Sequence, residues 1–186
     1  MKNILITGGA RSGKSHLAQE LARSSGKRVL FVATATAGDE EMRHRIEKHR
    51  QSRPPAWSTL EVTGHVGQHI RQGIGPAQVV IVDCITLLVG NVFSRYLDQT
   101  GEPFDASLVE KEVISEIGEL AECIKQVNAC FIIVTNEVGL GLVPTDKVGR
   151  LYRDLLGKAN QLLAERADEV YLMVAGLPLR IKPRAI

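Results

Sequence analysis

The chain has 186 residues, of which 44% are hydrophobic and 24% charged, and its formal net charge is +2. These values are typical of one soluble globular domain, which we expect to span residues 1–186. The nearly neutral charge and the 4% of aromatic residues argue against a nucleic-acid partner, which needs a basic surface and aromatic rings for base stacking.

The first predicted elements are a buried strand over residues 2–7 and a helix over residues 14–25. The loop between them has the pattern G-x-x-x-x-G-K-S, in the strand–loop–helix setting of a phosphate-binding P-loop. Its glycines let backbone N–H groups turn toward phosphate oxygens, and the helix start adds the positive end of its dipole. We expect Lys14 to reach the outer phosphates and Ser15 to bind Mg²⁺. The residues of this predicted nucleotide-binding loop are Gly8, Gly9, Ala10, Arg11, Ser12, Gly13, Lys14 and Ser15.

A second strand is predicted over residues 27–33, followed by a charged helix over residues 39–50. The helix has acidic residues at its start and basic residues at its end, an order that complements its dipole. Within it, Met42, Ile46 and His49 share one face, which we expect to point inward.

The rest of the chain alternates between strands and helices. The predicted strands cover residues 58–62, 78–83, 129–135 and 169–174, with residues 179–182 as an edge hairpin. The predicted helices cover residues 65–73, 107–127, 146–167 and the first part of 85–97, with loops over 98–105 and 136–144. This alternation predicts a single-domain P-loop NTPase fold of the α/β class, RecA-like, with a mostly parallel central sheet flanked by helices.

Parallel sheets of this kind bind ligands at the carboxyl ends of their strands. That rule gathers the P-loop, the small residues 34–38, Asp83 and the loop 136–144 around one crevice. Asp83 ends a strongly apolar strand, as the acid of a Walker B strand does, and its carboxylate is a suitable ligand for Mg²⁺. The alternative is an acid that only caps the following helix.

His49 has two interpretations from spacing alone. An inward histidine is most often a satisfied core residue. A neutral imidazole is also a competent nucleophile toward phosphorus, and Arg45, Arg50 and Arg53 would supply cations for phosphate oxygens.

The cysteines and the N-terminus bear on the compartment. Cys84, Cys123 and Cys130 are an odd, sparse set without the spacing of a zinc site, which fits free thiols in a reducing compartment. The apolar run at the N-terminus is too short for a signal peptide, and no segment reaches the roughly 18 apolar residues of a membrane helix. We therefore expect a cytoplasmic protein with no membrane span.

Several motifs together resemble one known family over nearly the whole chain. They are the P-loop, Ala33-Thr34-Ala35, Arg45-Ile46-x-x-His49-Arg50, Arg53-Pro54, Trp57, Glu61, Asp83-Cys84-Ile85-Thr86, Thr135-Asn136-Glu137-Val138-Gly139-x-Gly141-x-Val143-Pro144, Arg153-Asp154, Gly157, Asn160-Gln161 and Ala167-Asp168-Glu169-Val170. In these the chain resembles the bifunctional adenosylcobinamide kinase / adenosylcobinamide-phosphate guanylyltransferases of cobalamin biosynthesis. Asp83 stands at an acidic position that can also be Glu in that family.

The resemblance implies two reactions. A nucleoside triphosphate, ATP or GTP, phosphorylates the aminopropanol hydroxyl of adenosylcobinamide, and GTP then guanylylates that phosphate through a GMP–histidine, which by motif position is His49. Lys14 would neutralise the leaving pyrophosphate. The resemblance also implies a homotrimer, Mg²⁺ held by Ser15 and Asp83, and further nucleotide-binding residues: Ala33, Thr34, Ala35, Arg50, Gln51, Ser52, Arg53, Glu61 and Asp83.

Two other functions fit a P-loop protein of this size. One is a small-molecule kinase without nucleotidyl transfer. The other is a RecA-like ATPase module that acts on a nucleic-acid strand or on a partner protein. The sequence also leaves open which triphosphate donates the phosphoryl group, and whether one site or two serve the two reactions, because they take place at different phosphorus atoms.

Overall fold

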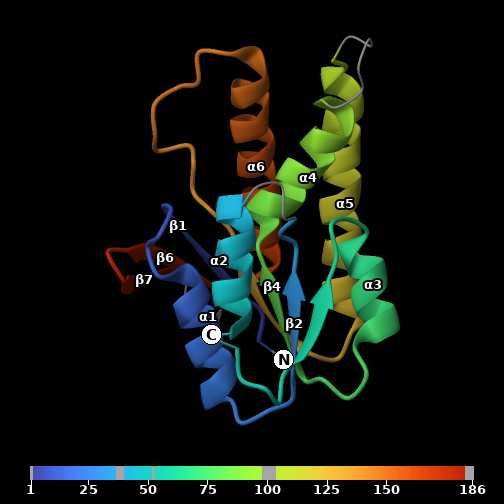
Figure 1. Cartoon of the computed structure of the whole chain (residues 1–186), viewed down its shortest axis with the longest axis vertical. Coiled ribbons are helices and arrows are strands. Elements are labelled where there is room, and N and C mark those ends of the chain that lie inside the picture. Colours follow the sequence, from blue (N-terminus) through green and yellow to red (C-terminus); the bar gives the residue numbers. More distant parts are fainter. Residues whose placement is uncertain (1, 37–39, 52, 98–103, 183–186) are drawn as a thin grey trace.

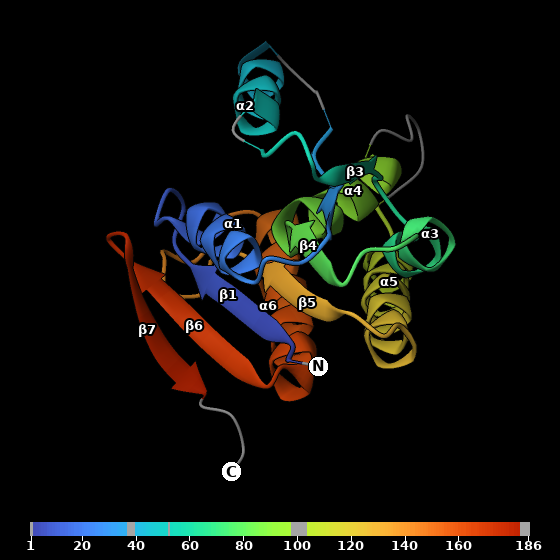
Figure 2. The same cartoon turned by 90° about the horizontal axis from the view of Figure 1, so that it is seen from below.

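The computed structural model describes residues 2–36, 40–51, 53–97 and 104–182, without the side chains of Glu41, Met42, Arg45 and His49. A seven-stranded sheet has the order β3-β2-β4-β5-β1-β6-β7, in which only the β6–β7 pair is antiparallel (Figures 1 and 2). Its strands are β1 (Ile4–Gly8), β2 (Val29–Ala33), β3 (Ser58–Glu61), β4 (Val79–Asp83), β5 (Cys130–Val134), β6 (Glu169–Val174) and β7 (Leu177–Lys182).

The helices confirm the predicted pattern, with one correction. They are α1 (Lys14–Ser24), α2 (Glu40–Gln51), α3 (Val66–Gly73), α4 (Ile85–Leu97), α5 (Ala106–Gln126) and α6 (Lys147–Arg166). The apolar run after Asp83 is helical over its whole length, not only at its start. The predicted loop over 98–105 lies mostly outside the described residues. No helix in the described ranges is long and apolar enough to cross a membrane.

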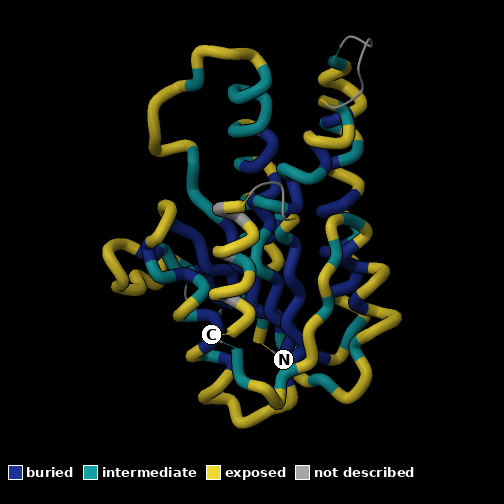
Figure 3. Tube along the Cα trace, in the orientation of Figure 1, coloured by how far each residue is buried: buried dark blue, intermediate teal, exposed yellow. Residues whose placement is uncertain are grey.

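The two faces of the sheet are covered unequally. One core cluster joins alternate strand residues such as Val32 and Val82 to α3, α4, α5 and α6, while the other joins Phe31 and Ile81 to α1. Because both faces are buried, the strands are continuously apolar rather than alternating. Figure 3 shows these strands as a buried centre, with the long connection between β5 and α6 exposed.

Helix α2 stands apart from the sheet and from α1 (Figure 2). Its apolar side chains are few, and half-buried Ile46 belongs to neither core cluster. The face of Met42, Ile46 and His49 was expected to point inward; Ile46 is partly covered but does not join the core. The side chains of Met42 and His49 lie outside the described residues.

Helix α3 is held against α5 by two carboxylates. Glu116 accepts hydrogen bonds from the backbone N–H groups of His65 (2.7 Å) and Val66 (2.8 Å), and Glu119 accepts one from Gln68 (2.5 Å). These side chains satisfy N–H groups that the first turn of a helix leaves without intrahelical partners. The close approach depends on Gly67, because a Cβ there would lie 2.5 Å from the backbone oxygen of Glu119.

We expect Gly67→Ala to lower the free energy of unfolding by about 2 kcal/mol, the usual cost of overpacking. The added methyl group can be placed only if α3 and α5 move apart, since the contacted atom is backbone. Urea denaturation measures the change. Gly73→Ala in the same helix meets no atom within 4 Å and is the matched control, expected to be neutral or slightly stabilising. Equal stability of the two variants would contradict this account of the α3–α5 contact.

Candidate nucleotide site

The strand register places three predicted site residues in one row. Glu61 on β3, Ala33 on β2 and Asp83 on β4 are direct lateral neighbours at the carboxyl ends of their strands. In-register residues of parallel strands point to the same face, and Ala33 belongs to the core cluster on the α1 face. The two carboxylates therefore flank a small residue on the face where the P-loop leads into α1.

The P-loop has the backbone that its sequence predicts. Gly8 has φ +141°, and a Cβ there would lie 2.5 Å from the backbone oxygen of Met173, so only glycine fits. Gly13, with φ +96°, directly precedes the first residue of α1. The hydroxyls of Thr7 and Ser12 are buried and have no hydrogen-bond partner among the described residues. Ser12 is thus suited to donate to a phosphate oxygen.

Lys14 is a buried cation at the start of α1. Its Nζ donates a hydrogen bond of 2.6 Å to the carbonyl of Gly9 within the loop. Burial lowers the pKa of Lys14, while Cys84 and Asp83 act in the opposite direction. Burial raises the pKa of Cys84 to about 11, so that thiol is neutral at pH 7 and the relevant negative charge is Asp83. An anion placed here would favour the charged form of Lys14.

Ser15 and Asp83 each offer an oxygen ligand of the kind that Mg²⁺ prefers. Both are half-buried and offer oxygen ligands, one from the first turn of α1 and the other from the end of β4. Mg²⁺ is typically bound by one or two such protein oxygens together with waters and substrate phosphates.

Arg53 is a second cation on this face. Its guanidinium carbon lies 3.9 Å from the centre of the Phe31 ring, and its Nε and Nη1 are buried without a hydrogen-bond partner in the described structure. Burial lowers the pKa of Arg53, while Asp83 and Glu61 raise it. Burial thus leaves two donors without partners beside the row of carboxylates, an arrangement that suits a phosphate or another anion.

The hydroxyl, the backbone N–H and the carbonyl of Thr34 all have hydrogen-bond partners within the protein. Its hydroxyl donates to the carbonyl of Cys84 (2.7 Å) and accepts from the N–H of Cys84 (2.9 Å). Its backbone N–H bonds to Asp83, and its carbonyl accepts from the Asn91 side chain at 2.8 Å. Thr34 therefore fixes the end of β2 against the end of β4. Sequence reasoning missed Asn91, although a lone amide within an apolar helix is a signal of such a role.

The loop after β5 lies against the P-loop, as predicted. The N–H of Glu137 donates to the carbonyl of Gly8 at 3.0 Å. Asn160 on α6 holds the loop by accepting from the Thr135 hydroxyl and donating to the carbonyl of Asn136.

Ala35 is half-buried just after the end of β2, and the remaining predicted residues lie on or beside α2. Arg50 and Gln51 are exposed at its end, Ser52 lies outside the described residues, and His49 is described only as backbone. Arg50 is near enough to Arg53 to lower its pKa. The described residues thus bring together Lys14, Arg53, Glu61 and Asp83, and leave the histidine on a helix beside them.

Comparison with known proteins gives one family. The model described as "Cobinamide kinase / cobinamide phosphate guanyltransferase" matches residues 4–181. The "Bifunctional adenosylcobalamin biosynthesis protein CobU" of Escherichia coli is 42% identical over 96% of this chain and 99% of that protein. The CobP protein of Pseudomonas aeruginosa, described in the same words, is 41% identical over 96% of each chain.

A solved structure is similar in fold alone. The RadB recombinase matches with a TM-score of 0.51 and 16% identity, over 92% of this chain and 73% of that chain. The likeness supports the predicted P-loop architecture with a mostly parallel sheet.

Proposed function

The chain belongs to the cobinamide kinase / cobinamide phosphate guanyltransferase family, and on that basis we propose that it catalyses two successive reactions of cobalamin biosynthesis. The first phosphorylates adenosylcobinamide with a nucleoside triphosphate. The second transfers GMP from GTP to the product, giving adenosylcobinamide-GDP and pyrophosphate. The observation that carries this proposal is the cluster of Lys14, Arg53, Glu61 and Asp83 on the face of the P-loop.

In the kinase reaction, the P-loop N–H groups and Lys14 hold the triphosphate while the substrate hydroxyl attacks the γ-phosphorus and loses its proton. The bond from the γ-phosphorus to the β–γ bridging oxygen breaks, and the nucleoside diphosphate leaves. Catalysis of this kind consists mainly of positioning and charge stabilisation. Ser15 and Asp83 would hold Mg²⁺, which when bound neutralises phosphate charge. Arg53 adds a positive charge on the same face.

In the guanylyl transfer, His49 attacks the α-phosphorus of GTP. A P–N bond forms, the bond to the bridging oxygen breaks, and pyrophosphate leaves, with its charge neutralised by Lys14. An oxygen of the acceptor phosphate then attacks the same phosphorus, the P–N bond breaks, and His49 is released. Pyrophosphate is thus displaced first, and the diphosphate linkage of the product forms second.

The other predicted nucleotide contacts divide into two roles. We propose that Arg50, Gln51, Ser52 and Arg53 bind the nucleotide beside α2. Ala33, Thr34 and Ala35 instead shape the space next to it, because the Thr34 hydroxyl already has its partners.

Glu61 is proposed to accept hydrogen bonds from N1–H and the 2-amino group of guanine. Glu61→Gln keeps the shape but turns an amide toward those donors, so we expect the GTP KM for adduct formation to rise about tenfold or more. The rate of protein labelling by α-labelled GTP, measured over a range of GTP concentrations, gives this KM. Glu122→Gln, an exposed change on α5, is the control, and an unaltered KM in Glu61→Gln would remove Glu61 from guanine recognition.

Mass spectrometry after incubation with GTP and Mg²⁺ tests the function. The expected result is a GMP adduct on the protein, which disappears as adenosylcobinamide phosphate is converted to adenosylcobinamide-GDP. A small-molecule kinase without nucleotidyl transfer would transfer γ-phosphate and form no adduct.

We also propose that the enzyme is a cytoplasmic homotrimer. Exposed apolar side chains on the edge strand β7 support an interface between copies: Leu177, Leu179 and Ile181. Sedimentation equilibrium tests the trimer, and a monomeric mass at micromolar concentration would contradict it.

A further inference from the structure

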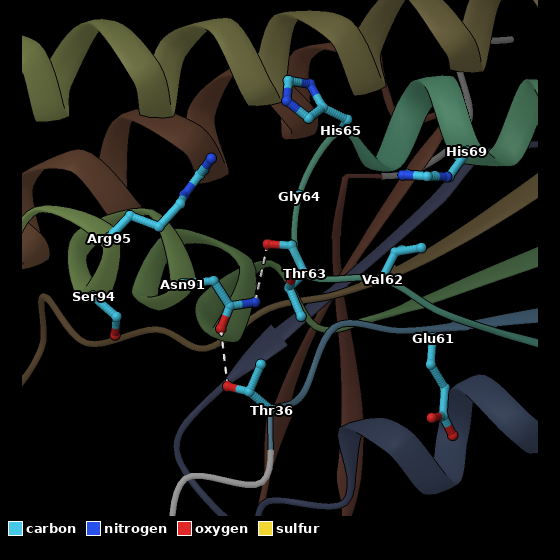
Figure 4. Close-up of a pocket in the computed structure, with 10 residues that line it drawn as sticks. All are labelled: Thr36, Glu61, Val62, Thr63, Gly64, His65, His69, Asn91, Ser94 and Arg95. Atoms are coloured by element: carbon cyan, nitrogen blue, oxygen red, sulfur yellow. Dashed lines mark hydrogen bonds between the residues drawn. The ribbon is translucent and has the colours of Figure 1, made fainter. Parts of the chain in front are cut away.

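A cavity of about 620 Å³ lies beyond the carboxyl ends of β2 and β3, between α3 and α4 (Figure 4). Its polar wall comes from Asn91, Ser94 and Arg95 on α4, and from Thr63, His65 and His69 in and before α3. None of these six residues belongs to the nucleotide contacts proposed above. We call this cavity the α3–α4 pocket.

The pocket and the row formed by Glu61, Ala33 and Asp83 lie on opposite sides of the same sheet edge. Glu61 forms the rim of the pocket, but in Figure 4 its side chain points away from the other lining residues. The strand register also directs Glu61 to the α1 face, with Ala33 and Asp83. A ligand in the α3–α4 pocket would therefore meet a nucleotide on the P-loop across this edge, from the side away from α1.

That position suits an acceptor. In phosphoryl and nucleotidyl transfer the incoming oxygen approaches in line with the departing group. Once GMP is bound to His49 the departing group is the histidine, so the acceptor oxygen must approach the phosphorus from the side away from α2. Arg53, two residues beyond the end of α2, lies over Phe31 on the α1 face, and Figure 2 shows α2 on that side of the sheet, so the acceptor is expected from the other side. The α3–α4 pocket opens on that side of the sheet edge.

The wall of the pocket is preformed and carries groups for an anion. The Asn91 amide donates to the carbonyls of Thr34 (2.8 Å) and Thr63 (3.2 Å), and its oxygen accepts from Thr36 (3.3 Å). Asn91 thereby connects the segments that follow β2 and β3 to α4. Figure 4 shows Arg95 and His69 extending toward each other over Thr63 and Gly64, with the Ser94 hydroxyl on the same helix as Arg95.

We propose that the α3–α4 pocket binds the phosphorylated aminopropanol arm of the acceptor, with its phosphate monoester near His69 and Arg95. The inference rests on the proposed function and assigns its second substrate a site. A cavity of this volume accommodates one group of drug-like size, so the corrinoid macrocycle would lie outside it.

Single-turnover transfer from preformed GMP-enzyme to adenosylcobinamide phosphate tests the proposal, because GTP binding no longer contributes. Ser94→Phe fills the pocket from an exposed helix position, and His69→Ala removes a polar group from the opposite wall. Both variants should form the adduct at the wild-type rate but need roughly tenfold more acceptor for half-maximal transfer.

The matched controls are Leu97→Phe on α4 and Arg71→Ala on α3, which lie outside the pocket lining and should transfer as the wild type does. Unchanged acceptor dependence in both pocket variants would overturn the assignment. Slower adduct formation with an increased GTP requirement would also overturn it, since the pocket would then hold the nucleotide. A wild-type enzyme that forms no adduct would instead overturn the proposed function, and the inference with it.

Discussion

Replacing Lys14 by alanine is expected to lower both the kinase and the guanylyl transfer rates about a thousandfold. Lys14 is buried at the start of α1, and its Nζ bonds to the carbonyl of Gly9 inside the loop. In both proposed reactions it would face phosphate charge from a buried position, where one missing donor typically costs a factor of 10²–10³. Product formation from γ-labelled and α-labelled GTP measures the two rates separately.

Lys14→Met separates charge from packing. Methionine keeps most of the buried side chain but supplies no hydrogen-bond donor. The Lys14→Met variant should therefore lose as much activity as Lys14→Ala, while its free energy of unfolding stays closer to that of the wild type. Lys27→Ala removes an exposed lysine before β2 and should leave both rates unchanged. Preserved kinase activity in Lys14→Ala would show that the two reactions do not share this triphosphate site.

The sequence predicted the central parts of the fold well, for a physical reason. A strand buried on both faces must be apolar throughout, so runs such as Val79–Val82 could be recognised without a partner. The P-loop was equally visible, because the positive φ of Gly8 and Gly13 restricts those positions to glycine.

Contacts between distant segments could not be predicted in the same way. Glu116 on α5 bonds to the start of α3, about fifty residues earlier, and no local pattern marks either partner. The hydrogen bonds of Thr34 could not be predicted for a similar reason. Its motif indicates nucleotide binding, but the hydroxyl is engaged by Cys84 once β2 and β4 pair.

The α3–α4 pocket was not recognised for the same reason. Its walls come from α3 and α4, which are neighbours because β4 lies beside β2 in the sheet. Ser94, Arg95 and His69 belong to no motif of their own, and their shared cavity follows from the order of the strands. By contrast, the rule for parallel strands placed Asp83 and the residues after β2 at one edge of the sheet, and the register aligns Asp83 with the end of β2 and, through it, with Glu61.

The sharpest separation of the two activities is expected from His49→Ala. Without the imidazole no P–N bond can form, so the GMP adduct should vanish and guanylyl transfer should fall by about 10⁴-fold or more. The kinase reaction should stay within about twofold of the wild type, since its acceptor attacks the γ-phosphorus directly. Intact-mass measurement after GTP incubation and γ-phosphate transfer give the two readouts.

His44→Ala is the control, because this exposed histidine lies on the same helix. Alanine is the best helix former, so neither change should unfold α2. Full labelling of His49→Ala would mean that another residue is the nucleophile. Loss of both activities would mean that α2 also positions the triphosphate. Loss of transfer alone, beside loss of both in Lys14→Ala, would show that one P-loop serves two reactions and that only the second needs the histidine.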